Sequence, residues 1–380
     1  MKFSFQTCVI VLFACLVGVA SCKKLDDEPE KGVPTLISRL YISFSDYRSN
    51  NSIKNLFIVD PADTNTMNNT FQYLSPSKGG GPVLFDPNAT SIFQASAGGI
   101  VQDTFIQRIA LDDVYGKPGD ASQIGYTGFT AVRGLGYYTY AQQNGNSGST
   151  VTNFLLAVTG QSMLYAISRP EGKGGSTGGS KIIDKQISLG NIVPSSLTLV
   201  QGNPDDRNEK LLVIGFNNET ENKSGFTVYK RLKQELIDRA GDTIVSSDKF
   251  KPELTVYVQG KTDLRAVSYA PNRQLFAVTA GKEVLFFKNP DALFSGSGEK
   301  TVSPDYIVGG TNTGFVLPQG IAIDDRLENG KFFYVSDVTT KMVSRFNLTD
   351  QGNATPELTK VYGTLIPNYI FLDARERTNF

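Results

Sequence analysis

Three prolines stand at equal intervals in the second half of the chain, and each begins a similar phrase. Pro252 opens Pro-Glu-Leu-Thr-Val-Tyr, Pro304 opens Pro-Asp-Tyr-Ile-Val-Gly, and Pro356 opens Pro-Glu-Leu-Thr-Lys-Val-Tyr. The interval is 52 residues both times. A fixed period of this size is typical of a chain built as an array of one supersecondary unit. The repeat therefore constrains the fold more than any other feature of the sequence.

The clearest unit contains four short apolar runs separated by turns. Residues 318–324, 331–337 and 342–348 form three runs, and the phrase after Pro356 forms the fourth. Their length and their β-branched and aromatic content are typical of strands, and no long helical period interrupts them. Four antiparallel strands per unit is the blade of a β-propeller. We therefore predict an all-β chain.

The same template, applied backwards along the chain, predicts six four-stranded blades. Earlier units begin near residues 264, 196, 130 and 83, and the segment 229–240 reads as a strand extension with a loop. Two inserts, 142–150 and 171–180, are expected to be flexible loops by composition. The stretch Asp113–Gly160 fits the template loosely, so a seven-bladed propeller is the alternative.

The two ends of the predicted propeller complement each other. The first unit has strand patterns at 39–44, 55–60 and 71–74 but lacks a first strand. The segment 367–373 matches the first-strand phrase 318–324, and no second strand follows it. We predict that 367–373 is the innermost strand of the first blade. This pairing closes the ring and removes exposed sheet edges.

The N-terminus has the pattern of an export signal. Lys2 precedes an apolar run from Cys8 to Ala20 that is shorter than the roughly 20 residues of a membrane span. The run ends Val-Ala-Ser-Cys at Cys22, which resembles the lipobox of bacterial lipoproteins. This resemblance implies cleavage before Cys22 and lipidation of its thiol, while an ordinary signal with a chance cysteine is the alternative.

A charged segment follows the predicted lipidation site. Residues 23–32 read Lys-Lys-Leu-Asp-Asp-Glu-Pro-Glu-Lys-Gly, a composition typical of a solvated tether. The stretch is similar to the one after the lipidated cysteine in surface-displayed lipoproteins of Bacteroidota-type bacteria. We therefore expect a signal peptide at 1–21, a tether at 22–33 and one propeller domain at 34–380. We further expect an outer-membrane location at the cell surface, with a periplasm-facing anchor as the alternative.

The first and second strands of the last unit resemble a known group of propellers. Pro318-Gln-Gly-Ile-Ala-Ile-Asp, then a turn, then Phe333-Tyr-Val-Ser-Asp, is similar to the NHL-type and gluconolactonase-like six-bladed propellers. Calcium-dependent lactonases of that group gather Glu, Asn and Asp at the central channel. Most first strands here lack an acidic residue at their start, so the resemblance implies the fold more than the chemistry.

Two absent residue types exclude several kinds of catalysis. The 380 residues include no His and no Trp. Ser-His-Asp and Cys-His catalysis and His-ligated zinc are therefore excluded, because each needs an imidazole. The 37 acidic and 37 basic residues leave no basic excess, so nucleic acid is not an expected partner.

One face of the predicted propeller collects the candidate ligand-binding residues. Loops that enter the first strand and those that leave the second line the same face, which gives Arg133, Arg265, Gln319, Asp46, Arg48, Asn217 and Asp337. The two first-strand arginines, Arg133 and Arg265, suit a carboxylate or sulfate ligand, and pairing with neighbouring carboxylates is their structural alternative.

Two acidic turns, 205–209 and 324–328, resemble oxygen-rich cation sites. They occupy the same hairpin in their blades, so we expect solvated turns there.

These patterns together favour a membrane-anchored, non-catalytic binding or scaffold module for a glycan or protein ligand. No cofactor is expected, although calcium stays open. The alternative is a cation-dependent, lactonase-like hydrolase that uses channel carboxylates and amides.

Overall fold

The structure, a computed structural model, describes most of the chain after residue 34. The described residues are 35–50, 52–96, 98, 103–112, 115–143, 149–173, 176–177, 182–203, 206–238 and 243–377. The expected signal peptide, Cys22 and the tether lie outside them. The chain divides into two units, one of residues 37–375 and one of residues 1–36 with 376–380. The architecture below is that of residues 37–375.

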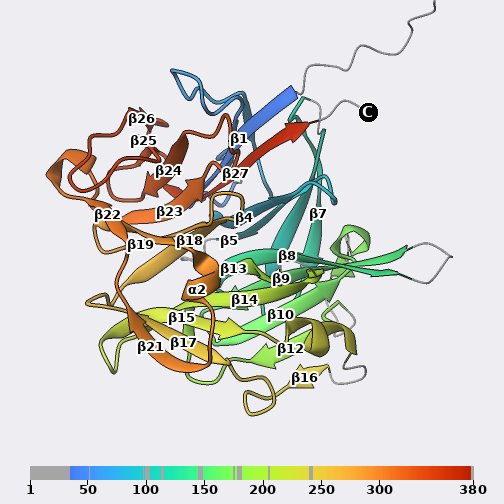
Figure 1. Ribbon diagram of the computed structural model, residues 1–380. Coiled ribbons are helices and arrows are strands. Elements are labelled where there is room, and N and C mark those ends of the chain that lie inside the picture. Colours follow the sequence, from blue (N-terminus) through green and yellow to red (C-terminus); the bar gives the residue numbers. More distant parts are fainter. Residues whose placement is uncertain are drawn as a thin grey trace, which may run out of the picture. The chain divides into compact units, whose positions relative to one another are not determined.

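Six antiparallel sheets, called blades 1 to 6, make up the fold, as the all-β prediction requires (Figure 1). Each is given from its innermost strand outward. Blade 1 is β27 (Pro367–Arg377), β1 (Thr35–Phe44), β2 (Leu56–Val59) and β3 (Phe71–Tyr73). Blade 2 is β4 (Gly80–Asp86), β5 (Ser91–Ser96), β6 (Phe105–Leu111) and β7 (Pro118–Gly125). Blade 3 is β8 (Val132–Gln143), β9 (Ser149–Thr159), β10 (Met163–Ser168) and β12 (Lys185–Ser188).

The second half of the chain follows the same plan. Blade 4 is β13 (Val193–Asn203), β14 (Asp206–Asn218), β15 (Lys223–Tyr229) and β17 (Leu254–Val258). Blade 5 is β18 (Leu264–Ala270), β19 (Leu275–Ala280), β20 (Glu283–Lys288) and β22 (Tyr306–Gly309). Blade 6 is β23 (Pro318–Ile323), β24 (Phe332–Asp337), β25 (Met342–Asn347) and β26 (Leu358–Val361). The six-bladed prediction is confirmed, and the stretch left open for a seventh blade belongs to blades 2 and 3.

The segments between the blades carry more regular structure than the sequence predicted. The described ends of the insert at 142–150 are strand, because β8 continues to Gln143 and β9 begins at Ser149. Segment 229–240 contains a short π-helical turn, Gln234–Asp238, and α2 (Pro290–Leu293) follows blade 5's third strand. Three short strands add in parallel to outer strands: β11 (Ser176–Thr177) to β7, β16 (Ile244–Val245) to β12, and β21 (Gly298–Val302) to β17. The prediction of a plain loop at 171–180 was therefore wrong at Ser176–Thr177, whereas residues 144–148 of the other insert lie outside the described residues.

The hydrophobic core lies between the blades. Strand residues alternate in direction, so each blade presents apolar side chains to both neighbours. Six buried clusters result, and each joins one pair of adjacent blades, from blades 1 and 2 round to blades 6 and 1. Strand β19 shows the consequence, because all six of its residues are buried. A closed ring follows, since every blade shares a cluster with the blade on either side.

Strand β27 closes that ring, as predicted. It is hydrogen-bonded to β1, so the two ends of the described chain share one sheet, and in Figure 1 the red β27 lies beside the blue β1. Asn368 of this strand also contacts both neighbouring blades. Its side-chain Nδ2 donates to the carbonyl of Gly80 at 3.1 Å, and its carbonyl accepts the Ser336 hydroxyl at 3.2 Å.

The three equally spaced prolines mark one position in three blades. Pro252, Pro304 and Pro356 each stand two residues before an outermost strand, respectively β17, β22 and β26. The acidic residue between proline and strand holds the outer strand to the third strand of its blade. Glu253, for example, donates its N–H to the Val228 carbonyl at 2.9 Å and accepts the Lys230 N–H at 2.8 Å.

We call this arrangement the outer-strand clasp, and five of the six blades have it within the described residues. The backbone N–H bonds join Thr70 to Ile58, Asp184 to Ala166, Glu253 to Val228, Asp305 to Phe286 and Glu357 to Arg345, at 2.7–3.0 Å. In four of these clasps the side-chain oxygen accepts a second backbone N–H on or just beyond the third strand. Blades 1 and 3 have the clasp without a proline before it, which explains why the repeat is visible in only three blades.

The clasp of blade 6 predicts a measurable loss of stability. Glu357 accepts Nε of Arg345 at 2.6 Å, and the Arg345 side chain is only 1% exposed. The substitution Glu357→Ala leaves that buried guanidinium without its carboxylate, so we expect the free energy of unfolding to fall by about 2 kcal/mol. Denaturant titration measures this change. In the matched control, Glu221→Ala breaks an exposed pair with Lys223 and should cost less than about 0.5 kcal/mol. Equal losses would contradict a stabilising role for the Glu357–Arg345 ion pair.

Candidate functional site

The innermost strands begin with a β-bulge in every blade whose register with the second strand is resolved. The pairing slips between Gly80 and Val83, Val132 and Gly134, Pro194 and Ser196, Leu264 and Val267, and Pro318 and Gly320. A bulge leaves a residue out of the ladder and turns its side chain away from the sheet. The residues left out in blades 3 to 6 are Arg133, Ser195, Arg265 with Ala266, and Gln319.

These bulged residues line one cavity at the end of the ring where the innermost strands begin. The cavity, called here the mouth, measures about 440 Å³. Its lining includes Arg133, Ser195, Arg265 and Gln319, together with Tyr369 from β27. Three predicted ligand-face residues therefore meet because the same irregularity recurs at the same place in successive blades.

The two arginines of the mouth have different roles. Arg265 donates through Nη1 to the carbonyls of Gly281 and Pro318, both at 2.9 Å, and its Nη2 pairs with Asp263. Burial lowers the pKa of this guanidinium, and the neighbouring carboxylates oppose that shift. Arg265 thus joins blade 5 to blade 6. This role agrees with the alternative prediction, in which Arg265 pairs with a neighbouring carboxylate instead of binding a ligand.

Arg133 is the exposed arginine of the mouth. Among the residues that the structure describes, no carboxylate forms an ion pair with it. Its guanidinium lies near the Tyr369 hydroxyl. Burial raises the pKa of Tyr369, and Arg133 and the Gln319 side chain oppose that rise. Arg133 therefore offers a charged group to solvent beside two polar side chains.

Ser195 and Tyr369 were missed by sequence reasoning, although a weak signal exists. Each bulged residue in blades 3 to 6 is followed by a small one, in Arg133-Gly134, Ser195-Ser196, Arg265-Ala266 and Gln319-Gly320. The small residue is needed because adjacent strands lie close. A Cβ on Gly134 would stand 2.6 Å from the Leu197 nitrogen, and one on Gly320 would stand 3.0 Å from the Ile370 nitrogen. A polar residue followed by a small one at the start of a first strand is thus the sequence mark of this bulge.

The other predicted site residues have structural contacts or lie elsewhere. Asn217 lines the mouth, but its amide exchanges two hydrogen bonds with the Leu264 backbone at 2.8 and 2.9 Å and so joins blades 4 and 5. Asp337 is buried and accepts four backbone N–H bonds. Asp46 accepts the Ile366 N–H at 2.6 Å, and Arg48 is exposed outside the cavity lining.

The acidic turn at 324–328 links neighbouring blades, whereas a solvated hairpin was expected there. Asp324 is fully buried and accepts Nε of Arg326 at 3.0 Å, and Arg326 also reaches Asp63 of blade 1 at 2.8 Å. Asp325 accepts the backbone N–H of Asn272, from blade 5, at 2.9 Å. Burial raises the pKa of Asp325 to about 6. Across the described ranges, no three Asp, Glu or Cys side chains are grouped to hold a metal ion.

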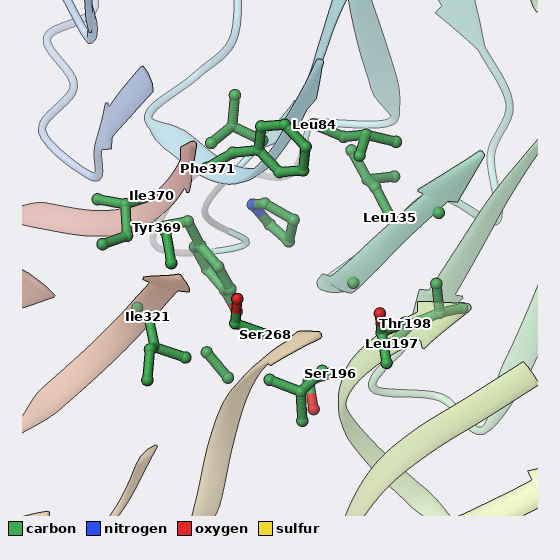
Figure 2. Close-up of a pocket in the computed structure, with 18 of the residues that line it drawn as sticks. Leu84, Leu135, Ser196, Leu197, Thr198, Ser268, Ile321, Tyr369, Ile370 and Phe371 are labelled. Carbon is green, nitrogen blue, oxygen red and sulfur yellow. The ribbon is translucent and has the colours of Figure 1, made fainter. Parts of the chain in front are cut away.

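A second cavity, called here the channel, occupies the axis of the ring. It measures about 360 Å³ and is lined by residues from all six innermost strands. Figure 2 shows Leu84, Leu135, Ile321 and Phe371 arranged around it. Arg133 and Tyr369 line both the channel and the mouth, so the two cavities meet at this pair.

Comparison with known proteins supports the fold. No protein-family model matches the chain, and no curated protein matches it in sequence. In structure it is similar to a chain of the nidogen/laminin complex, with a TM-score of 0.51 over 88% of this chain and 98% of that one, at 11% identity. It is also similar to a functionally unknown protein from Desulfotomaculum acetoxidans (TM-score 0.46, 10% identity, 90% and 89% covered) and to the Dos1 propeller (0.39, 11%, 82% and 67%). The first similarity supports a β-propeller, and at 11% identity it supports the fold alone.

No helix in the described part of the chain is long and apolar enough to cross a membrane.

The two mouth arginines should respond differently to the same substitution. Arg265→Gln removes the ion pair with Asp263 and bonds to blade 6, so the free energy of unfolding should fall by about 1–2 kcal/mol. Arg133→Gln removes no such contact and should change it by less than about 0.5 kcal/mol. Denaturant unfolding of the two variants measures the difference, and a larger loss for Arg133→Gln would show that it too is structural.

Proposed function

We propose that this protein is an exported lipoprotein, anchored in the outer membrane through Cys22, whose propeller is a non-catalytic binding module. The mouth is its ligand site, and the ligand presents an anionic group to Arg133. A uronate or sulfate of a glycan, an acidic side chain of a protein and a small organic acid all carry such a group. Display at the cell surface is part of the proposal.

The observation that carries the proposal is the recurring bulge. It places a guanidinium, a serine hydroxyl and a glutamine amide around one cavity, and Tyr369 adds a phenolic hydroxyl. Each of these groups donates hydrogen bonds, and Arg133 adds a positive charge in the planar geometry that suits carboxylates and sulfates. The mouth lining contains one carboxylate, that of the exposed Glu219, whereas a lactonase-like cation site would need several.

The anchoring part of the proposal is supported by the sequence. Lipoproteins of the Bacteroidota type share two features with this sequence, the lipobox-like Val19–Cys22 and the charged tether. For the propeller itself, the strand phrases of blade 6 are similar to those of NHL-type propellers.

If the mouth binds an anionic ligand, that ligand should raise the thermal stability of the protein. The thermal unfolding of a protein comprising residues 23–380 is measured with and without each of a panel of sugar acids, sulfate esters and aliphatic carboxylates. We expect at least one acid to raise Tm by several degrees, because a ligand that binds only the folded state stabilises it. Arg133→Gln should abolish that rise, whereas Arg48→Gln, an exposed arginine outside the lining, should retain it.

Two outcomes of this screen would contradict a binding module at the mouth. One is a set of acid-induced Tm shifts that Arg133→Gln leaves unchanged. The other is calcium-dependent turnover of a lactone that a chelator abolishes, which would favour the hydrolase.

The anchor is tested by Cys22→Ala in the full chain expressed in a Bacteroidota-type host. Mass spectrometry of the unsubstituted protein's N-terminus should find a diacylglycerol thioether on Cys22. The variant should no longer be found in the detergent-soluble membrane fraction. An unmodified Cys22, or unchanged membrane partition of the variant, would rule out the anchor.

A further inference from the structure

The channel is joined to the mouth at its positively charged end. Arg133 and Tyr369 stand where the two cavities meet, at the start of β8 and near the start of β27. The Tyr369 hydroxyl donates to the Arg133 carbonyl at 3.5 Å, so these two residues form the boundary between the cavities. A ligand bound through an acid group at Arg133 therefore lies beside the end of the channel. The structure thus offers room for more of the ligand than its charged group.

Apolar side chains from all six blades line the channel beside a similar share of polar wall. Each innermost strand contributes an aliphatic or aromatic side chain: Leu84, Leu135, Leu197, Val267, Ile321 and Phe371. The hydroxyl-bearing residues of the lining are Ser196, Thr198, Ser268 and three tyrosines. Ser268 is already engaged, because it accepts the Ile323 N–H at 3.1 Å. The six apolar side chains give an apolar group a surface to pack against, and the Ser196 hydroxyl, which has no hydrogen-bond partner among the described residues, adds a polar contact.

Different charged groups line the two ends of the channel. Arg133 is at the end shared with the mouth, while Asp86, the last residue of β4, and Asp325, just after β23, line the other end. Both carboxylates are held by backbone N–H groups. Arg375 and Arg273 interact with Asp86 and Asp325 respectively, whereas no described carboxylate pairs with Arg133. An anion is therefore attracted most strongly to the Arg133 end. This difference orients a bound amphiphile with its acid group at Arg133.

From this geometry we infer that the channel binds an amphiphilic carboxylate, with the carboxylate at Arg133 and the hydrocarbon tail between the innermost strands. The inference rests on the proposed function and narrows its ligand to an aliphatic acid. A cavity of about 360 Å³ is within the range of about 300–1,000 Å³ of small-molecule sites. The tail gains affinity because each buried methylene leaves water.

Titration calorimetry of residues 23–380 with three probes tests the inference. Sodium octanoate has both the charge and the tail, sodium acetate has only the charge, and octan-1-ol has only the tail. We expect octanoate to bind at least tenfold more tightly than either of the others.

Three variants separate the contributions of charge and tail. Arg133→Gln should weaken octanoate binding at least tenfold and leave octan-1-ol binding unchanged. Thr198→Phe, which fills part of the channel, should reduce the affinity for octanoate to that for acetate. Arg48→Gln, outside both cavities, should bind all three probes as the unmodified protein does. Thermal unfolding of each variant checks that it is folded.

Each other result overturns the inference in a distinguishable way. Equal affinities for octanoate and acetate, both lowered by Arg133→Gln, would show that only the mouth binds, so the channel inference would be wrong and the proposed function would stand. Equal affinities for octanoate and octan-1-ol would exclude recognition of the carboxylate. Absence of octanoate binding by folded protein would also refute the inference, and the acid screen would then decide the proposed function alone.

Discussion

The pairing of β27 with β1 is the constraint on which the rest of this fold depends. Each blade buries apolar side chains against two neighbours, and in the cluster between blades 6 and 1 Ile370 of β27 packs with residues of both blades. The same strand supplies Tyr369 to the mouth and Phe371 to the channel. Ring closure therefore completes both the core and the cavities, and a substitution that loosens β27 should disturb stability and the site together.

The site arises from an irregularity that the repeat preserves. A regular ladder would direct the first residues of each innermost strand against neighbouring blades. The bulges release Arg133, Ser195, Arg265 and Gln319 toward the axis instead. Ring geometry then gathers four side chains that are at least 50 residues apart in sequence. The chemistry varies from blade to blade because the bulge fixes where the side chain points and leaves its identity free.

Much of the fold could be predicted from sequence because its determinants are local. Strand runs, turns and the proline phrases defined the four-stranded unit, and the unmatched segment 367–373 predicted ring closure. The candidate site was harder to predict from the sequence. The sequence correctly predicted three residues at the start of their strands: Arg133, Arg265 and Gln319. It could not reveal that Arg265 forms an ion pair with Asp263 while Arg133 is exposed. Ser195 escaped because a bulge depends on the register between two strands, and residue type alone signals it weakly. Tyr369 escaped because only ring closure brings β27 beside the bulges of the other blades.

The outer-strand clasps have a consequence for the order in which this protein folds. Each clasp joins residues at most about 25 positions apart, so its loop closes at low entropic cost. The contact between β1 and β27, in contrast, spans more than 300 residues. Local contacts form quickly and distant ones slowly. Individual blades should therefore form early, and the ring, with the cavities that it encloses, should be completed only after β27 has been synthesised and has paired with β1.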